Sequence, residues 1–149
     1  MDRIKIEFDA VSENEGFARV CVADISNAKP AAFIMPLDPT LEEINDIKTA
    51  VSEAVTNSVI HGYNKKGGLI TLTAEIEEKT LKVIIEDSGR GIDNVKKAME
   101  PMFTTGEDDE RSGMGFTFMD VFMDGLEVWS EPGCGTRVTM FKRIGQETE

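Results

Sequence analysis

The sequence predicts an α+β fold in which helices cover one face of an antiparallel or mixed sheet. Three observations predict it. Strand-like and helix-like hydrophobic periods are mixed along the chain, and the last two strand patterns follow each other directly. The chain has 149 residues, which is the length of one domain with one core. No repeat, low-complexity tract or long linker divides it, so residues 1–149 are expected to form a single domain.

The N-terminal part is expected to hold a strand and a helix. Ile4, Ile6 and Phe8 alternate with polar residues, which predicts a strand over 3–9. Ser12 followed by Glu15 is a capping-box pair that predicts a helix over about 13–25. The buried stripe of this helix is expected to consist of Phe17, Val20, Cys21 and Ile25.

A second helix is expected after a proline-rich, irregular segment over 26–39. Two starts are open: Asp38 can cap with Pro39 at the first helical position, or Thr40 can cap with Glu43 reaching back. Apolar residues at helical spacing continue the helix to about residue 63; they are Leu41, Ile44, Ile47, Val51, Val55 and Val59.

The second half of the chain is expected to supply most of the sheet. Alternation predicts strands over 69–77 and 81–87, with a short helix near 93–99. The polar, aperiodic segment 103–112 is expected to be a mobile loop. An apolar helix over 116–123 follows it, and then two strands, 125–131 and 135–143, joined by a turn.

Composition excludes several classes of function. The formal net charge of −12 argues against a nucleic-acid or anionic-membrane surface. No apolar run reaches the ~20 residues that a membrane-spanning helix needs, and the first residues do not resemble a signal peptide. Cys21 and Cys134 lie far apart, so we expect a reducing, cytoplasmic location. With His61 as its sole histidine, the chain lacks most zinc-site patterns.

Glu53 and Asn57 are the first of three features that can carry chemistry. They are spaced i, i+4 on the second helix and so share one face beside its apolar stripe. A carboxylate and a carboxamide at that spacing can serve as general base and magnesium ligand. The alternative is a pair of helix-flank residues that bond to water or to neighbouring loops.

The second and third features are glycine-containing segments. Asp87 ends a strand and is followed by Gly89 and Gly91, so its carboxylate can accept from an exocyclic amine while the glycines let a ligand approach. The alternative is a plain Asx turn. Gly113 and Gly115 precede a helix whose free amides favour a phosphate, or else they form a simple hinge.

Together these segments resemble the ATP-binding domain shared by gyrase B, histidine kinases and MutL, known as the GHKL or Bergerat-type domain. Residues 53–57 look like its N box, 87–91 like its first glycine box and 113–115 like its second. The runs 51–63, 103–105 and 111–116 resemble the small anti-sigma serine kinases, and residues 17–20 and 122–124 point to their sporulation branch.

The resemblance implies a two-layer α/β sandwich that binds ATP or ADP with Mg²⁺ under a mobile lid. Asp87 would accept from the adenine amine, helped by Thr136, and Asn57 would ligate Mg²⁺. Glu53 would be the catalytic base, and Arg111 would neutralise charge near the terminal phosphate. The remaining nucleotide-binding residues that it implies are Gly89, Gly91, Thr104, Thr105, Ser112, Gly113, Met114, Gly115 and Phe116.

The resemblance also implies partners. The chain would hold a sporulation sigma factor of the F type, phosphorylate a serine of an anti-anti-sigma factor and work as a homodimer, with Arg19 in partner binding. His61 is not expected to be a phosphoacceptor, because this family phosphorylates a partner protein. Two alternatives remain open: a general-stress anti-sigma kinase with another sigma subunit, and a nucleotide-dependent binding module without kinase activity.

Overall fold

A computed structural model describes residues 2–11, 13, 14, 16, 18, 22, 34–100 and 115–145. Helical residues at 13, 14, 16, 18 and 22 follow β1 (Asp2–Asp9). A short 3-10 turn, η1 (Met35–Leu37), and the long helix α2 (Leu41–Asn57) come next. Helix α2 runs directly into a π-helical turn, η2 (Ser58–Gly62). The rest are β2 (Leu69–Glu77), β3 (Thr80–Asp87), α3 (Val95–Ala98), α4 (Gly115–Phe122), β4 (Gly125–Glu131) and β5 (Gly135–Arg143).

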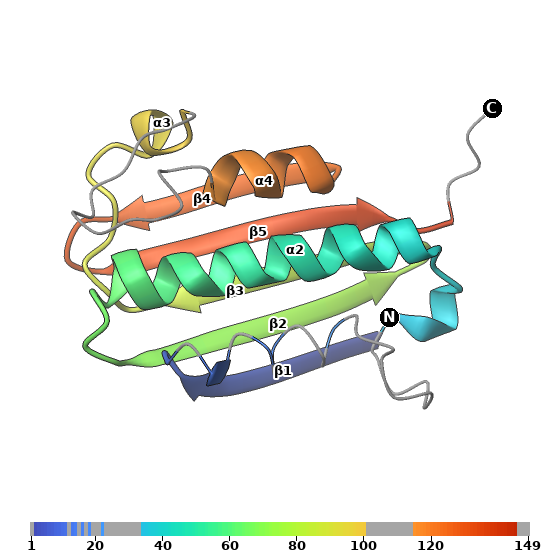
Figure 1. Cartoon of the computed structure of the whole chain (residues 1–149), viewed down its shortest axis with the longest axis horizontal. Helices are drawn as coiled ribbons and strands as arrows, with labels where there is room; N and C mark the ends of the chain where they lie inside the picture. The colour runs from blue at the N-terminus through green and yellow to red at the C-terminus, as the bar shows by residue number, and fades with distance from the viewer. Residues whose placement is uncertain are drawn as a thin grey trace.

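The five strands form one sheet in the order β1-β2-β3-β5-β4, and every neighbouring pair is antiparallel. Helices α2 and α4 lie side by side on the same face of this sheet (Figure 1). The expected α+β class with a helix layer on one face is therefore confirmed. The sheet expected to be antiparallel or mixed is wholly antiparallel among the described strands.

Helix α2 begins where the local sequence satisfies its free amides. The Thr40 side chain accepts from the Glu43 amide at 3.1 Å, and Glu43 Oε1 accepts from the Thr40 amide at 2.9 Å. This is the capping box of the second expected start. The first expected start is wrong, because Asp38 has a φ of 54° and lies outside the helix.

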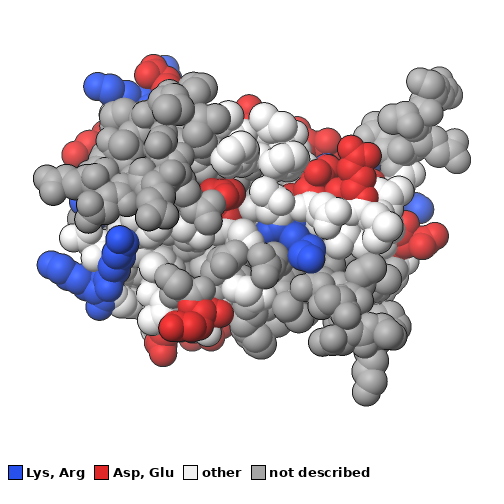
Figure 2. Space-filling view, viewed as in Figure 1, with Lys and Arg blue, Asp and Glu red and all other residues white. Residues whose placement is uncertain are grey.

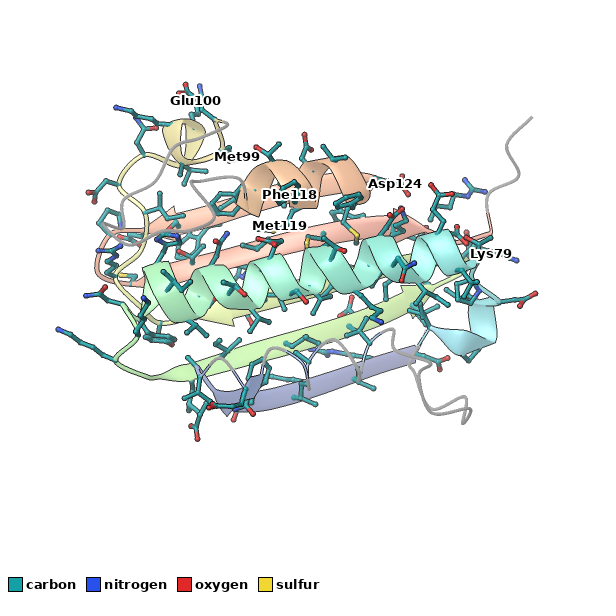
Figure 3. The ribbon with its side chains drawn as sticks, in the orientation of Figure 1. Lys79, Met99, Glu100, Phe118, Met119 and Asp124 are labelled. Atoms are coloured by element: carbon teal, nitrogen blue, oxygen red, sulfur yellow. The ribbon has the colours of Figure 1, made fainter. Side chains whose placement is uncertain are left out.

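The core lies between the helix layer and the inward side chains of the strands. Ile47, Val51 and Val55 of α2 are fully buried, as are Leu72, Val83 and Met140 from three strands of the sheet. Met119, on the side of α4 that faces α2 (Figure 3), is also fully buried. The apolar period of α2 is thus the face that packs on the sheet.

The buried side of the first helix is described at only two positions. Its described residues 13, 14, 16, 18 and 22 are helical, and Ala18 and Val22 are fully buried although neither belongs to the expected stripe. The side chains of the expected stripe and the capping pair Ser12–Glu15 lie outside the described residues.

The remaining boundaries follow the predictions closely. Strands β2, β4 and β5 match the expected ranges, and β3 begins one residue earlier at Thr80. Helix α4 begins at Gly115 instead of residue 116 and ends at Phe122 instead of residue 123. The expected loop over 103–112 lies outside the described residues. Among the described residues, no helix combines the length and apolar character that crossing a bilayer requires.

Candidate nucleotide-binding site

The ends of α2 and β3 and the start of β5 lie at the same end of the sheet (Figure 1). Antiparallel pairing places Asp87, the last residue of β3, directly opposite Thr136 of β5. The Asp87 side chain points to the helix layer, because it continues the inward row of Val83 and Ile85. The sheet therefore presents a carboxylate below the turn that ends α2.

Asp87 is held by hydrogen bonds from three sides. Ser58 Oγ, in the π-helical turn, donates to Oδ2 at 2.8 Å, and the Gly89 amide donates to Oδ1 at 3.0 Å. The Thr136 amide is a third donor. A carboxylate offers about four acceptor positions, so about one remains for an outside donor.

Burial raises the pKa of Asp87 above its ordinary 3.8, although the hydrogen bonds from Ser58, Gly89 and Thr136 oppose that rise. Desolvation is the larger effect because the carboxylate is partly enclosed by the η2 turn. A Cβ at Gly62 would lie 3.0 Å from Asp87 Oδ2. The absence of a side chain at Gly62 is therefore what allows η2 to come this close to the carboxylate.

The glycines after Asp87 serve backbone packing. A Cβ at Gly89 would lie 2.1 Å from the Gly62 carbonyl oxygen, and one at Gly91 would lie 2.2 Å from the Glu131 oxygen. Gly91 also has a φ of 74°, which favours glycine. The sequence suggested that these glycines let a ligand approach the backbone. Their close contacts within the protein explain Gly89 and Gly91 without a ligand. Both positions require glycine because the chain touches η2 and the β4–β5 turn.

Thr136 belongs to a hydroxyl cluster centred on Ser130 of β4. Ser130 Oγ donates to the Gly135 carbonyl at 2.8 Å, accepts from the Ile92 amide at 2.7 Å and lies 2.8 Å from Thr136 Oγ1. Since Ser130 gives its only proton to Gly135, Thr136 is the donor in the last contact. The cluster fixes the Thr136 side chain beside Asp87.

Glu53 and Asn57 are placed one helical turn apart on α2, as their spacing predicts. Glu53 is only 5% exposed. The Asn57 carboxamide lies against the start of α4, because a Cβ at Gly115 would be 3.0 Å from both Nδ2 and Oδ1 of Asn57. The structure therefore brings together the N-box asparagine and the last glycine of the expected second glycine box.

Several expected site residues have no described geometry. Phe116 is described, and its side chain is buried in the core at 9% exposure while its amide lies in the first turn of α4. The expected site residues outside the described part of the chain are Arg19, Thr104, Thr105, Arg111, Ser112, Gly113 and Met114.

Sequence reasoning did not identify Ser58, Tyr63 or Ser130. Ser58 directly follows Asn57, and its hydroxyl reaches Asp87 from the first residue of the π-helical turn. Tyr63 and Ser130 act on partners 25 and 38 residues away in sequence. No sequence pattern predicts the π-helical end of α2, so nothing in the local sequence indicated a role for Ser58, Tyr63 or Ser130.

The donor set fits an adenine nucleotide with magnesium. Asp87 offers an enclosed acceptor to an exocyclic amine, and the Asn57 amide oxygen is a hard ligand on the side of the helix that faces α4. The described residues contain no group of three or more acidic, histidine or cysteine side chains that could hold a metal ion. Magnesium that is bound mainly through phosphate oxygens needs only one or two protein ligands, which agrees with this arrangement.

Comparison with known proteins defines the class. Residues 31–142 match the family described as histidine kinase-like ATPase domain. A mycobacterial sensor histidine kinase, MprB, has a similar fold, with a TM-score of 0.55 at 17% identity over 68% of this chain and 72% of that one. The chain belongs to the histidine kinase-like ATPase domain family.

Within this family the chain is similar to anti-sigma F factors along nearly its whole length. The anti-sigma F factor of Clostridium beijerinckii is 56% identical over 96% of this chain and 95% of the relative. That of Clostridium acetobutylicum is 53% identical over 96% and 94%, and that of a Thermoanaerobacter species is 52% identical over 97% and 95%. The resemblance to anti-sigma F factors is therefore confirmed.

Proposed function

We propose that this protein is an ATP-dependent anti-sigma factor that holds a sigma factor of the F type and phosphorylates a serine of an anti-anti-sigma protein. The relatives named anti-sigma F factor support the sigma partner, and the histidine kinase-like ATPase family supports nucleotide use. The single observation that carries the kinase activity is Glu53, a buried carboxylate one helical turn before Asn57.

The nucleotide-binding step uses the junction of α2 and η2, where Asn57 and Ser58 are consecutive. Asp87 accepts from the adenine amine at the base end, with Thr136 beside it. Asn57 ligates Mg²⁺ at the phosphate end, next to Gly115 and the amides that open α4. Mg²⁺ supplies charge neutralisation at the phosphates when bound.

Glu53 acts on the partner's serine. Its carboxylate takes the hydroxyl proton as the serine oxygen bonds to the terminal phosphorus and the bond to the leaving diphosphate oxygen breaks. ADP and a phosphoserine are the products, and the proton remains on Glu53 until solvent removes it. Phosphoryl transfer needs mostly positioning and charge neutralisation, so one well-placed base is sufficient.

Partner capture is assigned to Arg19 and to the acidic helical face. Figure 2 shows carboxylates gathered near the end of α4, where Asp120 and Asp124 are exposed. These exposed carboxylates, on a chain whose formal net charge is −12, suit a basic sigma surface. The functional unit is a homodimer in the cytoplasm.

Phosphate transfer to the purified cognate anti-anti-sigma protein, followed with radiolabelled Mg-ATP, tests this function. Wild type should label a serine. Glu53→Gln should bind nucleotide with nearly unchanged affinity and lose transfer by at least about a hundredfold, the low end of what general-base catalysis contributes. Glu42→Gln, an exposed position in the first turn of the same helix, is the matched control and should label normally.

Two results would contradict the proposal. Retained transfer by Glu53→Gln would remove Glu53 as the base, and nucleotide-dependent sigma binding without any transfer by wild type would leave a binding module. Arg19→Glu separately tests partner capture, because it should weaken sigma pull-down and leave ADP affinity unchanged.

A further inference from the structure

Tyr63 bridges two strands next to the candidate adenine site. Its hydroxyl donates to the Leu69 carbonyl at 2.5 Å and accepts from the Ser88 amide at 2.7 Å. The ring is held in place, because a Cβ at Gly68 would lie 2.4 Å from a ring carbon. The hydroxyl is therefore fixed between the start of β2 and the residue after Asp87.

The position of this bridge follows from the register of the sheet. Ile70 and Asp87 are the last paired residues of β2 and β3 at this end. The next hydrogen bond of this ladder would run from the Ser88 amide to the Leu69 carbonyl. These two groups instead bond to the Tyr63 hydroxyl. Tyr63 thus extends the ladder through a side chain and fixes the peptide group that follows Asp87.

The same turn holds the Asp87 segment at further points. Ser58 Oγ donates to the Asp87 carboxylate at 2.8 Å, the Arg90 amide donates to the Gly62 carbonyl at 2.9 Å, and Arg90 Nε donates to the His61 carbonyl at 2.6 Å. Residues 58–63 and 87–90 are therefore joined at both ends and in the middle. The Tyr63 side chain joins these two segments to the start of β2 through Leu69.

We propose that Tyr63 is a positioning residue that orients Asp87 for adenine. The assignment rests on the proposed nucleotide-binding function. Without the hydroxyl, the Ser88 amide and the Leu69 carbonyl lose their common partner, and the peptide group after Asp87 loses one of the contacts that fix its orientation. The carboxylate keeps its donors Ser58 and Thr136, but its third donor, the Gly89 amide, follows the peptide group that Tyr63 holds, so its direction is less firmly fixed. The Tyr63 hydroxyl bonds to Leu69 and Ser88 and not to Asn57 at the phosphate end.

Calorimetric titration of Tyr63→Phe with ADP, GDP and tripolyphosphate tests the proposal. ADP affinity should fall about fivefold, the size expected for one lost hydrogen bond. The ratio of ADP to GDP affinity should narrow by the same factor, because guanine carries a carbonyl where adenine carries the amine. Tripolyphosphate affinity should not change. Lys66→Ala, an exposed residue of the same turn, is the control and should bind all three as wild type does.

The outcomes separate a positioning role from a merely structural one. A lower melting temperature with an unchanged ADP-to-GDP ratio would overturn the proposal. If wild type binds no ADP, the proposed nucleotide-binding function fails. If wild type binds ADP and Tyr63→Phe binds it equally well, only the role of Tyr63 fails.

A second measurement uses the wild-type protein and does not depend on how the variant folds. The chain contains one tyrosine, so a ring-labelled sample gives one tyrosine signal by NMR. Saturating ADP should shift that signal, and saturating tripolyphosphate should leave it in place. A signal that ADP does not move, or that both ligands move equally, would contradict a role in adenine recognition.

Discussion

Ser58 Oγ lies 2.8 Å from Asp87 Oδ2, which joins the turn after α2 to the end of β3 across 29 residues of sequence. Ser58 directly follows Asn57, the expected magnesium ligand. The base end and the phosphate end of the candidate site therefore depend on consecutive residues. Consecutive residues of a helix point in directions about 100° apart, so Ser58 faces Asp87 on the sheet while the Asn57 carboxamide lies against α4.

Replacing Ser58 by alanine should weaken both the fold and the adenine site. The variant loses a hydrogen bond to a charged group, which is worth about 1.5 kcal/mol of unfolding free energy. It also loses one of the contacts that lower the pKa of Asp87, so that pKa should rise further and ADP binding should weaken more at pH 5 than at pH 8. Denaturant unfolding and calorimetry at both pH values measure the two effects.

Ser88→Ala is the matched control for that variant. Ser88 is exposed and bonds to Tyr63 through its backbone amide, which the substitution keeps. It should match wild type in stability and in the pH dependence of ADP binding. Equal pH profiles for Ser58→Ala and wild type would refute the assigned role of the Ser58 hydroxyl.

Asp87→Asn should separate stability from function. Burial raises the pKa of Asp87 above 3.8 in the folded protein, so the folded state binds this proton more tightly than the unfolded chain does. The ionised carboxylate therefore costs stability at neutral pH, and this cost disappears as the pH falls through the folded pKa to 3.8 and below. Asparagine removes the cost, so the variant should be at least as stable as wild type at pH 7.

Thermal unfolding of both proteins between pH 7 and pH 3.5 checks the sign of this effect. The stability advantage of Asp87→Asn should shrink toward acid pH, since wild-type Asp87 is then also neutral. ADP affinity should fall sharply at pH 7 in the same variant. A stability difference that grows toward acid pH, or unchanged ADP affinity, would argue against an enclosed adenine acceptor at this position.

Gly115→Ala should weaken magnesium-dependent binding without destabilising the fold. Alanine gains up to about 1 kcal/mol of helix propensity over glycine, and the φ of Gly115 is not among the positive values. The new Cβ, however, would lie 3.0 Å from both terminal atoms of Asn57, so the carboxamide must move. Calorimetric ADP titrations with Mg²⁺ and with EDTA should show a loss in the magnesium arm alone, and an equal loss in both arms would contradict it.

Lys142 is a buried amine that fixes helix α4. Its Nζ donates to Asp46 Oδ2 of α2 at 3.1 Å and to the Phe122 carbonyl at the end of α4 at 2.7 Å. Lys142→Met keeps the apolar stem but leaves both acceptors without this donor, so the unfolding free energy should fall by about 2 kcal/mol.

Denaturant unfolding of Lys142→Met, Asp46→Asn and the double variant measures the coupling. The losses of unfolding free energy in the two single variants should add up to more than the loss in the double variant. Each single variant already removes the contact that the two side chains share. Arg143→Met is an exposed neighbour and serves as the control with little expected change. Strict additivity of the Lys142 and Asp46 losses would show that the ion pair does not stabilise the packing of α2 and α4.

Local sequence determined the elements of this fold. The two-residue period of Ile4, Ile6 and Phe8 identifies β1, because burial on one face of a strand requires alternation. The capping pair of Thr40 and Glu43 places the start of α2, because both partners lie within one helical turn. The i, i+4 spacing likewise places Glu53 and Asn57 on one face before any tertiary contact is known.

Only the tertiary structure decided how these elements make a site. The π turn at Ser58, the bridge from Tyr63 to Ser88 and the hydroxyl cluster of Ser130 all join groups more than 20 residues apart. Local periodicity carries no information about such partners, because hydrogen bonds between distant segments depend on sheet register and helix packing. The sequence determined which chemical groups the protein has, and the packing of α2 and η2 on the ends of β3 and β5 determined which of them meet.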